Sequence, residues 1–170
     1  MYYFQNSILG ETDETYRIDS SEENREAALA LVRQCQYTLE IISRYLDPSI
    51  YDNDEFMKAV QKLALRSKRS RIRILVREPE TVVKQGHRLL ELAMNFSSFI
   101  EIRKPSPEFA DHNEALLVCD TTGYIHRQLA DRYEAMVKYA DRPRAEEFLR
   151  QFDEMWETAI IDPNLRRLNI

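Results

Sequence analysis

Apolar positions along the chain recur in two rhythms that predict different elements. In four segments they return every three or four residues, which predicts amphipathic helices over about residues 20–36, 54–64, 80–95 and 143–156. Shorter runs rich in β-branched residues predict strands at about residues 38–43, 72–76, 99–102, 114–119 and 124–127. The last two are expected to form a hairpin. A further edge strand is indicated near residues 16–18.

Residues at the ends of these segments support the predicted boundaries. Ser20 followed by Glu23 has the spacing of a capping box at the start of the first helix. Asp54 can cap the second helix, and Pro143 suits the first residue of the last one. These local signals agree with the periodicity of the apolar positions.

The order of the elements predicts the class of fold. Helices and strands alternate through the first hundred residues with connections of roughly 20 residues, which is typical of parallel crossovers. We therefore expect an α/β fold with a mixed, largely parallel sheet and helices on both faces. No linker-like segment divides the chain, so residues 1–170 are expected to form a single domain, with 1–19 as an N-terminal extension or edge strand.

The composition argues against several classes of function. The formal net charge is −5, whereas a general nucleic-acid coat or a binder of anionic membranes favours an excess of cations. No apolar run approaches the roughly 18 residues of a membrane span. The first residues also lack the features of a signal peptide. Cys35 and Cys119 lie in apolar segments and are expected to be buried free thiols in a reducing compartment, so we expect a cytoplasmic protein.

Glycine and histidine are too scattered for the common cofactor sites. Gly10, Gly86 and Gly123 are isolated, so the chain cannot build a phosphate-binding loop, a dinucleotide loop or the pyrophosphate loop of an acyl-CoA-dependent acetyltransferase. The three histidines form no HxH or HxxxH pair, and His126 has no acid at a fixed spacing to orient it. We expect neither a cofactor nor a bound metal.

Cationic side chains follow several predicted strands, at the ends where ligands gather in open α/β sheets. The candidate ligand-binding residues are Arg44, Arg77, Lys104, His112 and Arg127. If the strand ends converge, these residues form a small cationic pocket suited to a phosphate or carboxylate. Alternatively, the guanidinium groups extend into solvent or pair with neighbouring acids. The densely basic segment 62–77 has no aromatic side chain to stack on bases, so a solvated face is favoured over a nucleic-acid groove.

From about residue 20 to residue 160 the chain resembles a single phospholipase D-like domain. The resemblance rests on the strand 39–43 leading into the segment 45–48 (Tyr-Leu-Asp-Pro), on the strand 73–76, and on a strand opened by His112. Such domains carry the pattern His-x-Lys-x4-Asp. The resemblance implies a histidine that attacks phosphorus, a lysine that holds the phosphate and an aspartate that orients its partner. It also implies that two copies of the motif, from two halves or two subunits, face each other.

The segment 111–120 departs from this pattern at two positions. With His112 aligned to the histidine of the motif, Glu114 occupies the lysine position and Cys119 the aspartate position. Asp120 lies one residue late, and on a strand it would point to the opposite face. A carboxylate about 4 Å from a phosphate oxygen repels it by roughly 4 kcal/mol at an effective dielectric constant near 20, where a lysine would attract it equally. The difference corresponds to several powers of ten in rate.

Three functions remain open. The first, which we favour, is a non-catalytic phospholipase D-like domain that binds an anionic ligand or a protein partner as a homodimer. The second is a homodimeric phosphodiesterase or nuclease in which His112 is the catalytic residue and Arg44, Arg77 or Lys104 holds the phosphate. The third is an accessory or regulatory subunit of an acyltransferase-type enzyme. It arises because the chain also resembles a poorly characterised bacterial group, some of whose members look like appendages of acetyltransferases.

Overall fold

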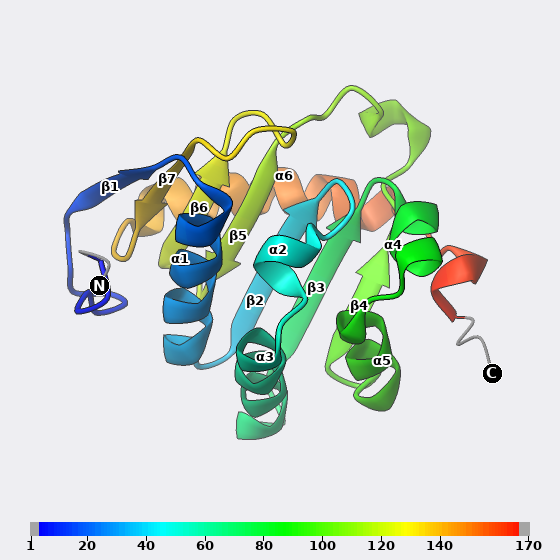
Figure 1. Ribbon diagram of the computed structural model, residues 1–170, viewed down its shortest axis with the longest axis horizontal. Helices are drawn as coiled ribbons and strands as arrows, with labels where there is room; N and C mark the ends of the chain where they lie inside the picture. Colours follow the sequence, from blue (N-terminus) through cyan, green and yellow to red (C-terminus); the bar gives the residue numbers. More distant parts are fainter. Residues whose placement is uncertain (1–3, 167–170) are drawn as a thin grey trace.

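A seven-stranded mixed sheet forms the centre of the computed structural model, which describes residues 4–166 (Figure 1). Across the sheet the strands follow the order β1-β7-β6-β5-β2-β3-β4. Their bounds are β1 (Thr15–Ile18), β2 (Thr38–Ser43), β3 (Arg71–Val76), β4 (Ile100–Arg103), β5 (Ala115–Cys119), β6 (Gly123–Arg127) and β7 (Ala135–Lys138). β1 lies at one edge, where the sequence indicates an edge strand. Residues 1–3 and 167–170 of the expected domain lie outside the described part.

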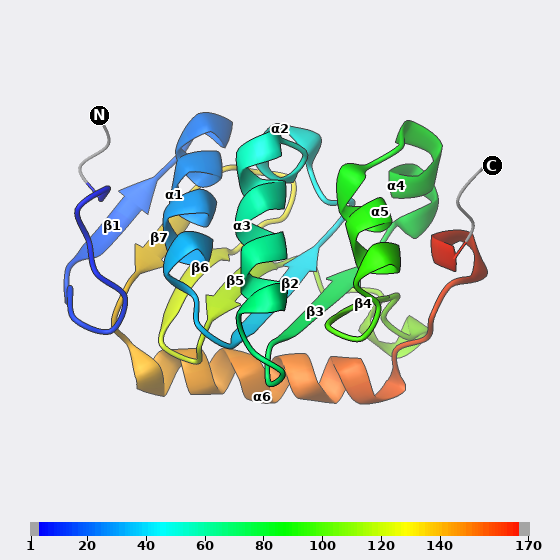
Figure 2. The same cartoon turned by 90° about the horizontal axis from the view of Figure 1, so that it is seen from below.

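Helices cover both faces of the sheet, as the sequence predicts. The helices α1 to α5 lie on one face, and α6 runs across the other (Figure 2). Their bounds are α1 (Ser21–Gln34), α2 (Pro48–Tyr51), α3 (Asp54–Arg66), α4 (Pro79–Gln85), α5 (Arg88–Asn95) and α6 (Arg142–Thr158). Two 3-10 helices, η1 (Pro107–Phe109) and η2 (Pro163–Arg166), follow β4 and α6.

The sheet is mixed, but the expectation that it is largely parallel is wrong. In the described chain only the pairs β2–β3 and β3–β4 are parallel, whereas β5 runs antiparallel to β2. The strands β6, β7 and β1 continue the antiparallel half. The difference arises because residues 104–114, between β4 and β5, contain no crossover helix. The chain instead returns over the end of the sheet and enters beside β2 in the opposite direction (Figure 1).

The single helix predicted over residues 80–95 is divided into α4 and α5. Gly86 lies between them at φ +74°, a conformation that glycine adopts without strain. His87 then caps α5, because its Nδ1 accepts a hydrogen bond from the Leu89 N–H at 3.1 Å. Its Nε2 donates to the Leu46 carbonyl at 3.0 Å. His87 is therefore a structural residue with both ring nitrogens bonded.

The face beneath α6 contains charged groups as well as a small apolar core. Arg73 on β3 lies 3.3 Å from the Glu40 carboxylate on β2 and 2.8 Å from the Asp153 carboxylate on α6. The same guanidinium lies over the Phe152 ring, 4.8 Å from its centre. Glu40 is only 3% exposed, and burial raises its pKa to about 7 although Arg73 acts in the opposite direction.

Replacing Glu40 with glutamine is expected to flatten the pH dependence of stability. The pKa of Glu40 rises from an ordinary value of 4.5 to about 7 on folding, so the folded state holds an extra proton between these values. The Glu40 carboxyl therefore makes the wild type less stable as the pH rises from about 4.5 to about 7. The Glu40→Gln protein should not show this loss of stability. Urea unfolding at about pH 5 and about pH 8 measures the difference.

The matched control for this prediction is Glu55→Gln, because the Glu55 side chain is 64% exposed. The control should follow the wild type across the same pH range. Equal losses of stability in the wild type and Glu40→Gln would contradict the assigned pKa.

Candidate functional site

The carboxyl ends of β2, β3 and β4 open into a cavity of about 630 Å³. Arg44, Arg77 and Lys104 line it, and each follows the last residue of one of these strands. Three of the five predicted ligand-binding residues are thus brought together, at the edge of the sheet where ligands gather. Asn113 and Ile160, which were not among the residues predicted from the sequence, also line the cavity.

The three cations differ in the ion pairs and hydrogen bonds that they form with other groups of the chain. Arg44 forms an ion pair with Glu78. Arg77 donates to Asn113 Oδ1 at 3.0 Å and to a backbone carbonyl of the loop before β5 at 2.7 Å. The Lys104 ammonium has neither an ion pair nor a hydrogen bond within the described chain. Lys104 is therefore the cation most available to a ligand.

His112 does not line this cavity but belongs to a compact group with Glu114 and His126. The Glu114 carboxylate lies 3.8 Å from His112 Nε2 and 3.4 Å from His126 Nε2. The His112 side chain is only 10% exposed, and neither of its ring nitrogens has a hydrogen-bond partner within residues 4–166. Burial lowers the pKa of His112, Arg77 lowers it further, and Glu114 opposes them. The ring is therefore neutral near pH 7.

The acid beside His126 is Glu114, which immediately precedes the neighbouring strand β5 and stands at no motif spacing from this histidine. In the antiparallel pair of β5 and β6, Leu116 lies directly opposite His126. Glu114 is two residues from Leu116, and the diagonal distance across a strand pair is within reach of its side chain. The contact between Glu114 and His126 therefore follows from the register of the hairpin and not from a spacing within a sequence motif.

Asp120 supports the sheet and lies at the opposite end of β5 from His112. Its carboxylate accepts hydrogen bonds from the backbone N–H groups of residues 36, 37 and 38 at 2.7, 2.8 and 3.0 Å. These donors precede or open β2, so the contact joins the end of β5 to the start of its central neighbour. The five residues of β5 span roughly 17 Å at about 3.4 Å each, which is too far for Asp120 to orient the His112 ring.

Substitution of Asp120 is expected to reduce stability, because three backbone donors lose a charged acceptor. Asp120→Ala should lower the free energy of unfolding by roughly 2–4 kcal/mol, and Asp120→Asn, which keeps one acceptor, by less. Urea unfolding measures both changes. Asp131, which is exposed, provides the control substitution to alanine. An Asp120→Ala protein as stable as the control would show that these hydrogen bonds contribute little.

Arg127 is buried away from the cavity. Its guanidinium donates to the backbone carbonyls of Arg132 at 2.8 Å and Ala130 at 2.7 Å. It also lies over the Tyr133 ring at 5.3 Å, and the Tyr133 hydroxyl donates to the Asp47 carboxylate at 2.7 Å. Arg127 therefore orders the loop between β6 and β7 and is not placed with the other predicted ligand-binding residues.

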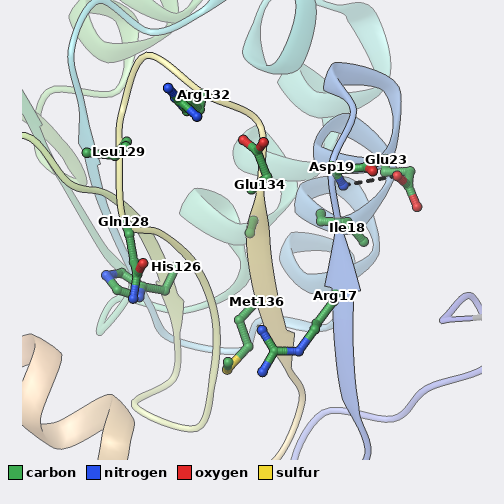
Figure 3. A pocket seen from close by; sticks show the side chains of 11 residues that line it. Arg17, Ile18, Asp19, Glu23, His126, Gln128, Leu129, Arg132, Glu134 and Met136 are labelled. Carbon is green, nitrogen blue, oxygen red and sulfur yellow. Dashed lines mark hydrogen bonds between the residues drawn. The ribbon is translucent and has the colours of Figure 1, made fainter.

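A second cavity, of about 570 Å³, opens over β6, β7 and β1 (Figure 3). Along its floor Met136 is paired with His126 on one side and with Arg17 on the other. Acidic side chains, including Asp19 and Glu134, line the same space as the cations. Three acids and two arginines line this cavity, whereas three cations and two acids line the cavity at the ends of β2, β3 and β4, so this one is less suited to an anion.

Within residues 4–166, no group of three or more histidine, cysteine, aspartate or glutamate side chains is arranged to hold a metal ion. Cys35 and Cys119 are free and buried. No helix in this part of the chain has the length and apolar character needed to span a membrane.

Comparison with known proteins places the site on a recognised fold. Residues 20–168 match the family described as "Domain of unknown function (DUF7931)". Among curated proteins, no sequence matches this chain. Nuc from Salmonella typhimurium, a phospholipase D family member, has a TM-score of 0.57 at 18% identity over 86% of this chain and 97% of its own. NucT from Helicobacter pylori has a TM-score of 0.62 at 11% identity over 88% of this chain and 99% of its own.

A DNA-binding protein shares the same architecture. TrmBL2, described as an archaeal chromatin protein with a novel mode of DNA binding, has a TM-score of 0.64 at 15% identity. The match covers 91% of this chain but 56% of TrmBL2, so the chain spans about half the length of that protein. At such identities these likenesses show the fold alone. They confirm the phospholipase D-like α/β fold predicted from the sequence.

Proposed function

We propose that this chain, which belongs to the family described as Domain of unknown function (DUF7931), is a non-catalytic phospholipase D-like domain that binds an anionic ligand. The proposed ligand occupies the cavity lined by Arg44, Arg77 and Lys104. The proposal includes a homodimer, joined where phospholipase D-like domains bring two half-sites together.

The position of Glu114 carries the proposal. Its carboxylate lies 3.8 Å from His112 Nε2, so a phosphoryl group within reach of this imidazole would meet a negative charge. At about 4 Å and an effective dielectric constant near 20, the repulsion is roughly 4 kcal/mol, which corresponds to about three powers of ten in rate. Asp120 binds backbone N–H groups of the sheet, and His112 Nδ1 has no hydrogen-bond partner within residues 4–166 to orient the ring. The group around His112 therefore disfavours phosphoryl transfer.

The cavity at the strand ends has the charges that the His112 group lacks. Three cations and two acids, Glu78 and Asp162, line this cavity. Of the acids, Glu78 is already paired with Arg44. The guanidinium of Arg77 is held in place by two hydrogen bonds, and Lys104 is unpaired within the described chain. Fixed guanidinium groups and free ammonium groups are strong partners for phosphate oxygens.

Inorganic phosphate is expected to bind the wild-type chain with an affinity that depends on Lys104. Lys104→Ala removes one charge-assisted hydrogen bond and should weaken binding about tenfold or more. Isothermal titration calorimetry measures the affinity. Lys62→Ala is the matched control, since Lys62 is exposed on α3 and does not line the cavity. Equal affinities of the wild type and Lys104→Ala would place the anion elsewhere.

Phosphodiester hydrolysis is the alternative function, and we expect none above background. The assay uses bis(p-nitrophenyl) phosphate with the wild type and with His112→Ala, and both should behave alike because Glu114 repels the phosphoryl group. Turnover by the wild type that disappears in His112→Ala would establish a phosphodiesterase in place of a binding domain. Sedimentation equilibrium on the same samples tests the dimer, and a monomer would remove that part of the proposal.

A further inference from the structure

The cavity proposed to bind an anion is much larger than an inorganic anion needs. Its volume of about 630 Å³ falls within the roughly 300–1,000 Å³ typical of sites for whole organic ligands. A phosphate group in contact with Arg77 and Lys104 fills only part of this space. The remaining lining therefore indicates what kind of group is attached to the anion.

Part of the cavity lining is apolar. Pro105, Pro107 and Phe109, which follow β4, make up this apolar wall together with Ile160, which follows α6. The Ile160 residue keeps 57% of its surface exposed. An apolar ligand group that covered it would be stabilised by the burial of this surface. The aromatic ring of Phe109 adds a surface on which a flat ligand group can stack.

Backbone contacts hold the wall in position next to the cations. Lys104 and Ile160 form an antiparallel bridge in which their N–H and C=O groups pair at 2.7 and 2.9 Å. The two prolines restrict the backbone between this bridge and η1. At the far end, the Arg77 guanidinium donates to the Ala110 carbonyl at 2.7 Å. A wall fixed in this way loses little conformational entropy when a ligand binds.

We infer that the ligand of this cavity is a small organic phosphate whose ester group is apolar or aromatic, an inference that rests on the proposed function and extends it. The phosphate contacts Arg77 and Lys104, and the ester group lies against Phe109 and Ile160. The bridge between Lys104 and Ile160 makes the charged and the apolar parts of the site adjacent. A polar ester group such as a sugar would lose hydration against Phe109 and Ile160, whose side chains offer it no hydrogen bond.

Isothermal titration calorimetry with three probes tests the inference on the wild-type chain. The probes are inorganic phosphate, phenyl phosphate and glucose 6-phosphate, which share the anion and differ in what it carries. Phenyl phosphate is expected to bind about tenfold more tightly than the other two, because only its ring buries apolar surface. If no probe binds, the proposed function itself fails. If all three bind equally and Lys104→Ala weakens them equally, the anion site stands and the present inference is overturned.

A matched pair of substitutions locates the apolar contact. Ile160→Ser should bring the affinity for phenyl phosphate towards that for inorganic phosphate, whereas Leu65→Ser should keep the wild-type ratio. The two residues are 57% and 58% exposed, but Leu65 lies on α3 outside the cavity. Because both side chains are exposed, the folded state should tolerate either change, and thermal unfolding verifies this. An unchanged ratio in Ile160→Ser would refute the placement of the ester group on this wall.

Discussion

The hydrogen bonds of the Asp120 carboxylate fix the centre of the sheet, and the arrangement of the other elements depends on this point. β2 is the strand at which the parallel half, β2-β3-β4, meets the antiparallel half that begins with β5. Asp120 accepts three backbone N–H groups at the start of β2 and thereby sets Leu39 opposite Cys119. A one-residue slip would break these charge-assisted bonds and turn every side chain of β5 to the other face.

This register separates the two groups of side chains that could act on a ligand. Even-numbered residues of β5 pack towards α6, and odd-numbered ones pack into the larger core on the opposite face. Glu114 lies beside His126, whose ring centre is 4.7 Å from the ring centre of Phe148 on α6. Its chain neighbour Asn113 instead bonds Arg77 at the cationic cavity. The Glu114 carboxylate therefore lies beside the two imidazoles, and the uncharged Asn113 lines the cationic cavity.

Features with a local signal could be predicted from the sequence. The strand expected at 38–43 coincides with β2, and Arg44, Arg77 and Lys104 converge because parallel strands bring their carboxyl ends to one edge. The hairpin of β5 and β6 was predicted from local signals too, but β7 and the antiparallel entry of β5 beside β2 were not. β7 has four residues, and alternation cannot show that the chain turns back towards β2. The contact between Glu114 and His126 depends on hairpin register, which no motif spacing encodes.

Helix α6 connects the stability of the sheet to the shape of the cavity. Beneath it Arg103 lies 4.3 Å from the centre of the Trp156 ring and donates to the Trp156 carbonyl at 3.1 Å. The Arg103 side chain is partly buried, at 25% exposure, and a charged group with reduced access to water favours fixed partners within the protein. These contacts therefore fix the end of α6 against β4. Ile160 follows that end by two residues and pairs with Lys104, the neighbour of Arg103. The interactions that hold α6 on the sheet thus also set the apolar wall beside the cation that we expect to bind the ligand.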